Sequence, residues 1–202
     1  MEIDFKQLPP QECYRWLAGT VTPRPIAWVS TVSKDGITNL APFSFFQVIC
    51  DKPPTLMVNI ASYEDGSLKD TLRNVQETGE LVIHVVSCEQ SEIMNASSAT
   101  FPHGISEFES CGIASEPAAV VRPPRVQKAV VAHECKLTQV IPYPAEKPRW
   151  HVIYAEVIRT HIDDRVLDKN GRIDILKLDV LGRLSGNMFC STRELIELER
   201  PA

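Results

Sequence analysis

The stretch TPRPIAWVSTVSKDGITNLAPFSFFQVI, residues 22–49, has the pattern of two strands joined by a tight turn. Its first run, 26–32, is rich in β-branched and aromatic residues, which favour strands. The KDG sequence at 34–36 is typical of a hairpin turn, and a second apolar run follows at 39–49. The stretch therefore predicts an antiparallel strand pair near the start of a β-rich chain.

Four further runs have strand character. Two are short, 55–61 and 81–87, and two are long and alternate between apolar and polar residues, 129–141 and 149–162. Many long strands with few helices between them are typical of a barrel. We therefore expect a mainly β fold, with the 202 residues forming one domain, 1–202.

Helix signals are fewer. The best marked segment, 67–79, has an apolar stripe, Ser67 as a candidate N-cap and Gly79 as a stop. Two other segments have the capping-box pattern, in which a serine is followed three residues later by Gln or Glu. These segments begin at Ser87 and at Ser191, the second predicts a helix over 191–199, and a short helix is also expected over 9–18.

Composition limits the classes of partner. The net charge is −5, which argues against a nucleic-acid partner, so a phosphate ligand would need a local positive pocket. No apolar run is long enough to span a bilayer, and the acidic N-terminus has no apolar signal core. None of the six cysteines forms a C-x-x-C pair, so we expect reduced thiols. These features predict a cytoplasmic protein with no membrane partner.

Arg24 and the segment 39–46 carry the first polar groups that suit a ligand. Prolines on both sides of Arg24 hold its backbone extended, so its side chain has few ways to move. Pro42 cannot donate to a strand ladder and therefore marks an edge or a bulge, where backbone amides are freed. Asn39 and Ser44 add side-chain donors and acceptors beside it.

Residues 67–71, SLKDT, form the third such segment, at an expected helix start. A helix N-terminus offers unpaired N–H groups and a positive dipole end, which suit a phosphate. Lys69 adds a charge and Thr71 a hydroxyl, whereas Asp70 is also explained as a capping acid. An apolar floor, backbone donors and a phosphate anchor suit flavin mononucleotide (FMN), although purely structural roles for all three segments stay open.

Several motifs together resemble the flavin reductase-like, FMN-binding split-barrel family. They are TPRPIAWVST, NLAPFSFF, DKPPTLMVNI and KDTLRNVQETGELVIHVV, in that order, followed by EFESCGI at 107–113 and RLSGNMF at 183–189. The resemblance spans about residues 12–190. It implies a Greek-key split β-barrel, a homodimer, and FMN held near the subunit interface.

The same resemblance implies a flavin reductase that uses NADH or NADPH and often supplies reduced flavin to a partner monooxygenase. The alternative is a flavoredoxin-like FMN electron carrier without NAD(P)H activity of its own. The residues that the resemblance assigns to FMN binding are Arg24, Pro25, Ile26, Ala27, Asn39, Ala41, Pro42, Phe43, Ser44, Asn59, Lys69, Asp70 and Thr71. No catalytic side chain is expected, since the hydride chemistry belongs to the cofactor.

Other chemistries have weaker support. His133 and Cys135 share one strand face, and His151 and His161 on the next strand could join them at a metal, but isolated strand histidines are usually core or rim residues, so we expect no metal site. There is no G-x-G-x-x-G fingerprint for a Rossmann nicotinamide site. Two further expectations are that Trp28 and Trp150 are core residues and that His103 lies in a surface turn rather than in a lid.

Overall fold

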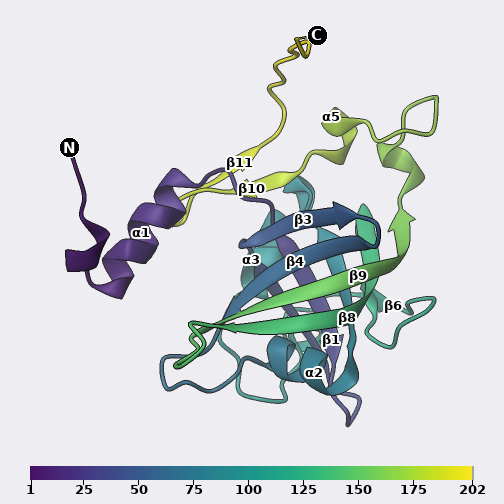
Figure 1. Cartoon of the computed structure of the whole chain (residues 1–202). Coiled ribbons are helices and arrows are strands. Elements are labelled where there is room, and N and C mark those ends of the chain that lie inside the picture. Colours follow the sequence, from purple (N-terminus) through teal and green to yellow (C-terminus); the bar gives the residue numbers. More distant parts are fainter. Residues whose placement is uncertain (202) are drawn as a thin grey trace.

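The computed structural model describes residues 1–201. Seven strands form one sheet in the order β2-β1-β5-β8-β9-β4-β3, and all six neighbouring pairs are antiparallel. The sheet curves into an open barrel that is split between its edge strands, β2 and β3 (Figure 1). The strands are β1 (Ala27–Val32), β2 (Thr38–Phe43), β3 (Phe46–Asp51), β4 (Pro54–Ala61), β5 (Glu80–Val85), β8 (Val131–Tyr143) and β9 (Trp150–Ile162). The mainly β, Greek-key split barrel expected from the sequence is confirmed.

The predicted hairpin is present, but the run 39–49 forms two strands rather than one. Strand β2 pairs with β1 from Val32↔Thr38 to Ala27↔Phe43 and then ends, while β3 lies on the opposite edge of the sheet. Between them Ser44 and Phe45 cross the split, and the Phe45 carbonyl accepts a hydrogen bond from the Asn59 amide at 2.8 Å. Pro42 lies in an edge strand, where its missing N–H breaks no central ladder. This β2–β3 crossing positions the candidate site.

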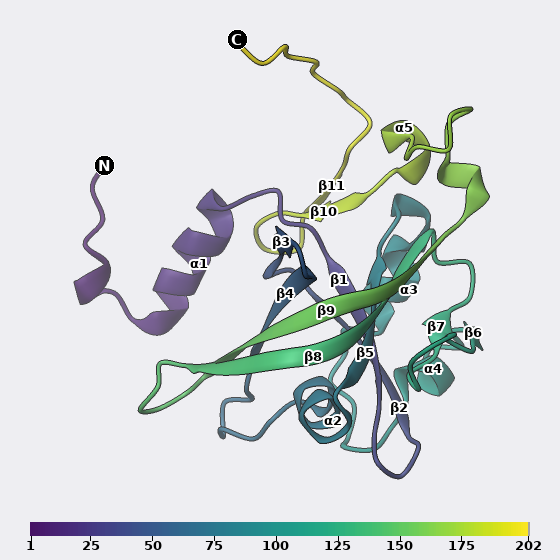
Figure 2. The same ribbon diagram turned by 45° about the vertical axis from the view of Figure 1, so that its right-hand side comes forward.

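Helix α2 (Asp70–Thr78) lies at the end of the barrel away from the C-terminus (Figure 2). Its Leu72 and Val75 are fully buried in the main core, which they share with residues of β1, β4, β5 and β9. It stops as predicted at Gly79, which has the left-handed φ of 70° that glycine adopts without strain. It starts at Asp70 and not near Ser67, because the Ser67 N–H and hydroxyl both donate to the Asp65 carboxylate in the preceding turn.

The remaining helices are short, except α1 (Pro10–Thr20), which confirms the helix expected near 9–18. After Ser87 a 3₁₀ turn, η2 (Cys88–Gln90), leads into α3 (Ser91–Ala96), and the Ser87 hydroxyl makes no capping bond. The other elements are η1 (Phe5–Gln7), α4 (Glu107–Ser110), η3 (Asp164–Val166) and α5 (Ile175–Leu178), with the strand pairs β6 (Ser115–Glu116) with β7 (Arg125–Val126) and β10 (Leu181–Arg183) with β11 (Phe189–Ser191).

The predicted helix over 191–199 is wrong. Residue 191 ends β11, and the chain from 192 to 201 has no regular structure and extends away from the barrel (Figure 1). Leu195, Ile196 and Leu198 are all exposed, so the apolar stripe of this segment has nothing to pack against. A helix this short is marginal in water without tertiary packing, and a capping box does not replace it.

Two outlying parts flank the split. Helix α1 stands beside the barrel and buries only Ala18, and the β10–β11 hairpin lies between α1 and the sheet (Figures 1 and 2). No helix within residues 1–201 has the length and apolar character needed to cross a bilayer.

Candidate functional site

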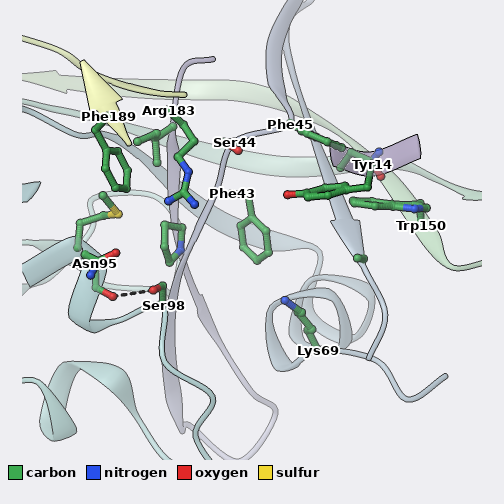
Figure 3. A pocket seen from close by; sticks show the side chains of 15 residues that line it. Tyr14, Phe43, Ser44, Phe45, Lys69, Asn95, Ser98, Trp150, Arg183 and Phe189 are labelled. Atoms are coloured by element: carbon green, nitrogen blue, oxygen red, sulfur yellow. Dashed lines mark hydrogen bonds between the residues drawn. The ribbon is translucent and has the colours of Figure 1, made fainter. Parts of the chain in front are cut away.

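A cavity of about 570 Å³ lies along the β2–β3 crossing, between α1, α3, β4 and the β10–β11 hairpin. Figure 3 shows its walls: aromatic side chains on one side, Arg183 and Phe189 on the other, and Lys69 near α2. The volume lies within the range of about 300–1,000 Å³ typical of small-molecule sites. Six residues predicted from the sequence line it, namely Ile26, Pro42, Phe43, Ser44, Asn59 and Lys69.

The aromatic wall joins three elements that are distant in sequence. Phe45 on the crossing and Trp150 at the start of β9 lie nearly parallel, with ring centroids 5.2 Å apart. Tyr14 of α1 completes a cluster of three rings, with its centroid 6.5 Å from that of Trp150 and 6.0 Å from that of Phe45. Flat rings arranged in this way offer a planar ligand apolar area and stacking partners.

Lys69 supplies a cation where the wall meets α2. It is the N-cap residue of that helix, whose first N–H groups have no partner within the helix. Its Nζ atom lies 5.9 Å from the Phe43 ring centroid and 5.6 Å from that of Tyr63. Burial lowers the pKa of Lys69, so its ammonium group is only partly hydrated and is suited to an anionic partner.

Asn59 on β4 lines the cavity and has a side-chain acceptor that the fold leaves unpaired. Its backbone N–H donates to the Phe45 carbonyl, but its side-chain Oδ1 is buried and has no hydrogen-bond partner among the described residues. Leaving such an atom unpaired costs free energy, and the cost is removed when a ligand donates to it. Because Asn59 lines the cavity, a turn of its side chain would bring this acceptor to a ligand that donates a hydrogen bond.

The side of the cavity opposite the aromatic wall comes from the β10–β11 hairpin and α3. Arg183 and Phe189 are cross-strand partners, and the guanidinium carbon lies 4.6 Å from the phenyl centroid. Below them, the Ser98 hydroxyl donates to the Asn95 carbonyl at 2.6 Å (Figure 3). This side therefore combines a cation with hydroxyl and amide groups.

Asn39 and Thr71, both predicted site residues, meet each other in the core instead of facing the cavity. Asn39 Nδ2 donates to the hydroxyls of Thr71 at 2.9 Å and Thr31 at 3.2 Å, and Asn74 Nδ2 also donates to Thr31 at 3.1 Å. All four side chains are buried. We call these four residues the α2 network, since they join the helix to β1 and β2.

Arg24 is buried beside the cavity but does not line it. Its guanidinium donates to the carbonyls of Ala18 and Val21 at the end of α1, and to that of Leu184 at 3.0 Å. Its Nε bonds to the Ser44 hydroxyl at 3.4 Å. Burial lowers the pKa of Arg24, and the proline-framed segment holds this cation against the carboxyl end of a helix, a favourable place for it.

Asp70, at the first position of α2, also lies outside the cavity lining. Its carboxylate contacts His103 Nδ1 at 2.6 Å and accepts from the Gly104 N–H at 3.3 Å. The His103 side chain is exposed, as expected for a surface turn. The three other predicted residues outside the lining are backbone neighbours of it, namely Pro25, Ala27 and Ala41.

Three of the remaining histidines, His84, His133 and His161, have structural partners, whereas the buried Nδ1 of His151 has none among the described residues. His84 Nδ1 bonds to the Trp28 carbonyl at 2.8 Å and its Nε2 accepts from the Val126 N–H at 2.9 Å, so the ring is neutral, and burial lowers its pKa to about 4. Trp28 is fully buried, which confirms the core assignment. His133 bonds to Thr160 and His161 to Glu134. Among residues 1–201 no three His, Cys, Asp or Glu side chains gather as metal ligands.

Sequence reasoning missed most of the residues that reach the cavity from outside the motif segments. Tyr14, Trp150 and Arg183 come from a flanking helix, from the start of a long strand and from the terminal hairpin. One signal did exist, because RLSGNMF at 183–189 was among the motifs that resembled the family. The other missed lining residues are Phe45, Ala61, Met94, Asn95, Ser98 and Phe189.

Comparisons with known proteins agree with this architecture. A protein of Aquifex aeolicus (strain VF5) with no assigned activity is 41% identical over 189 residues, which is 94% of either chain. The crystal structure of nitrilotriacetate monooxygenase component B from Bacillus cereus is 30% identical, covers 98% of both chains and has a TM-score of 0.93. That of the 2-nitrobenzoate 2-nitroreductase NbaA from Pseudomonas fluorescens is 28% identical, with a TM-score of 0.90, and covers 100% of this chain and 96% of the other.

The family comparison covers the whole barrel. The flavin reductase like domain matches residues 19–177, from the end of α1 to α5. The match includes Phe45, Trp150, Asn59 and helix α2 with Lys69, but not Tyr14, Arg183 or Phe189. Together with the relative at 41% identity, this match shows that the chain belongs to the flavin reductase like family.

Proposed function

We propose that the chain binds FMN in the cavity and catalyses its reduction by NADH or NADPH. The observation that carries the proposal is the combination of an aromatic wall, a half-buried lysine at a helix N-terminus and a buried acceptor without a partner in one cavity. These are the three features that a flavin with a phosphate tail requires: stacking area, an anion anchor and a polar contact for the ring edge.

Each group has a task toward the flavin. Lys69, at the N-terminus of α2, would hold the phosphate, and Asn59 Oδ1 would accept a hydrogen bond from an N–H of the ring edge. Pro42 and Phe43 at the end of β2, with Ser44 on the crossing, would give the ring its floor. Arg24 acts indirectly, because its guanidinium holds Ser44 and the end of α1 in place. We place Asn39 and Thr71 in the same supporting role, because they fix α2 and its phosphate-binding end.

FMN, when bound, supplies the hydride-accepting chemistry. Among the described residues that line the cavity there is no carboxylate and no histidine, which agrees with a transfer that needs no side-chain acid or base. The aromatic wall excludes water and sets the stacking distance, and the polar contacts fix the orientation of the ring.

The first test is a flavin-binding measurement. The purified protein, mixed with FMN and desalted, should retain flavin at about one per chain, because every group needed for binding comes from positions described above. Lys69→Gln should raise the FMN dissociation constant about tenfold, as expected for the loss of one charge-assisted contact. Arg172→Gln, a change at an exposed arginine far from the cavity, is the matched control. Failure of the unaltered protein to bind FMN would overturn the proposal.

A flavoredoxin-like carrier is the alternative function. Both functions need the same FMN site, so the discriminator is the reaction with reductant. Without oxygen, NADH or NADPH should bleach the flavin absorbance of a reductase within seconds. A carrier would keep its oxidised spectrum until another redox protein is added.

The similarity to a monooxygenase component B supports a further part of the proposal, that the reduced flavin is passed to a partner monooxygenase in the cytoplasm. A homodimer is also proposed. The edge strand β3 is exposed over Gln47–Asp51, with Val48 and Ile49 open to solvent, and Leu17 and Val21 are exposed on or next to α1. Sedimentation analysis tests it, with a monomer at micromolar concentration as the contrary result.

A further inference from the structure

Two arginines face each other at the edge of the cavity. Arg24 and Arg183 form an isolated antiparallel bridge in which each N–H donates to the other carbonyl, at 2.9 and 2.8 Å. Side chains of directly opposed residues project on the same side, and like charges placed so repel each other. None of the ion pairs within residues 1–201 involves either arginine.

The two arginines differ in how their charge is compensated. Arg24 is buried and gives its N–H groups to carbonyls at the carboxyl end of α1, where a cation is stabilised. Arg183 donates from its side chain to one carbonyl, that of Gly186, and stacks on Phe189. A guanidinium has five N–H donors, so most of those on Arg183 are left for a ligand.

A second cavity, of about 530 Å³, begins at Arg183. It lies between α1 and the turn that follows β10, and it shares Tyr14 and Arg183 with the first cavity. Three arginines line it, Arg15, Arg24 and Arg183, against one acid, Glu12. Arg15 and Glu12 pair weakly at 3.5 Å on the exposed surface of α1, which leaves the inner part of the cavity positive.

The flavin cavity thus has two separate cations, Lys69 near α2 and Arg183 on the opposite wall (Figure 3). FMN carries a single phosphate, and one cation with a helix N-terminus is enough to hold it. The second cation needs another anion. The reductant brings one, because a nicotinamide dinucleotide that lays its nicotinamide over the flavin must extend its phosphates and its second nucleotide beyond the flavin cavity.

We propose that Arg183 binds a phosphate group of the nicotinamide dinucleotide, and that the second cavity, beneath α1, receives the part of the dinucleotide that extends past the flavin. The inference rests on the proposed function, and it assigns the two cations to two different ligands: Lys69 to FMN and Arg183 to the reductant.

The test is a crossover of two variants and two ligands. FMN affinity is measured by quenching of flavin fluorescence. Binding of NADP⁺ and NAD⁺ to the FMN-loaded protein is measured by perturbation of the flavin absorbance, so that no turnover occurs. Arg183→Gln should weaken dinucleotide binding at least about tenfold, with FMN retained, and Arg183→Lys should restore part of it. Inorganic pyrophosphate should compete with NADP⁺ in the unaltered protein and lose this effect in Arg183→Gln.

Lys69→Gln should give the reverse pattern, with weaker FMN binding and unchanged dinucleotide affinity once FMN is saturating. Arg172→Gln controls for the change in net charge, and the melting temperature of each variant controls for folding. Unchanged NADP⁺ affinity in Arg183→Gln overturns the inference, as does a loss of FMN in that variant alone, which would put the flavin phosphate at Arg183. Unchanged NADP⁺ affinity leaves the FMN site as proposed, and loss of FMN in Arg183→Gln moves only the phosphate contact from Lys69 to Arg183, whereas failure of the unaltered protein to bind FMN removes the proposed function as well.

Discussion

The α2 network and the cavity both reach the first turn of helix α2, and both contain polar side chains. In the network, Asn39, Asn74, Thr31 and Thr71 bond to one another and are closed to solvent. In the cavity, Asn59 Oδ1 has no partner among the described residues, and the Lys69 ammonium meets only aromatic rings. Polar side chains therefore stabilise the fold in the network, whereas in the cavity they are left for a ligand.

The contrast gives a way to separate structural from binding residues. A buried polar group that is satisfied within the chain stabilises the fold, and its loss leaves its former partner unpaired. A polar group that the chain leaves unsatisfied costs stability and is kept where a ligand pairs with it. Substitutions in the two regions should therefore affect different measurements, folding in one and FMN affinity in the other.

The largest expected effect comes from His84, the most completely satisfied polar group. Burial lowers its pKa to about 4 from 6.5, so between these values the unfolded chain binds a proton that the folded chain does not. Stability is then full above pH 6.5 and falls as the pH drops toward 4, by about 3 kcal/mol in total. Urea unfolding at a series of pH values measures this loss.

His133, whose pKa burial also lowers to about 4, adds a loss of the same sign. The ring proton signals in nuclear magnetic resonance separate the two, since each histidine can be followed by itself. A His84 ring that titrates near pH 6.5, or a stability that stays flat from pH 7 to 5, would contradict the assignment of a neutral, doubly bonded ring.

The second largest loss of stability is expected for Asn39→Ala in the α2 network. Thr71 loses its only side-chain donor and a small void opens, so the free energy of unfolding should fall by about 2 kcal/mol. FMN affinity, measured on folded protein, should change less than about threefold. The assignment of Asn39 to the structural group is wrong if Asn39→Ala is as stable as the unaltered chain but no longer binds FMN. Asn39 would then be a direct ligand.

The smallest expected effect on folding is that of Asn59→Ala. The change removes a buried acceptor that has no partner, so the free energy of unfolding should stay within about 0.5 kcal/mol. FMN affinity should fall about three- to tenfold, since one hydrogen bond to the ring edge is lost. A variant that unfolds readily while FMN affinity is intact would place Asn59 with the structural group.

The strands could be predicted from the sequence because their signal is local. Alternation and β-branched residues mark β1, β8 and β9, and the KDG turn fixes the first hairpin. The break at Ser44–Phe45 could not be predicted in the same way. An apolar run in the sequence has the same pattern whether it forms one strand or two strands on opposite edges of the sheet. The failed helix at 191–199 teaches the same lesson, because its capping signal is local and the missing packing is not.

The site divides in a similar way. Pro42, Phe43, Ser44, Asn59 and Lys69 were predicted because they lie in the motif segments that also form the barrel. Tyr14, Trp150 and Arg183 come together only when α1 and the terminal hairpin have folded against the split. These residues are far apart in the sequence, so no local pattern predicts that they are neighbours. For the same reason Asn39 and Thr71 were predicted as ligands, although three-dimensional pairing directs them toward each other.

The β2–β3 crossing also has a mechanical meaning. Ser44 and Phe45 are a two-residue strap that ties the first edge of the sheet to the last, and it forms one wall of the cavity. A ligand seated there contacts the end of β2, the crossing and the end of β4, which is the strand next to β3, and so acts as a clasp across the split of the barrel. Ligand binding therefore stabilises the closed form of the barrel relative to a form in which the split has opened. Slower amide exchange along β2 and β3 on ligand binding, with little change in β5 and β8, is the signature of such a clasp.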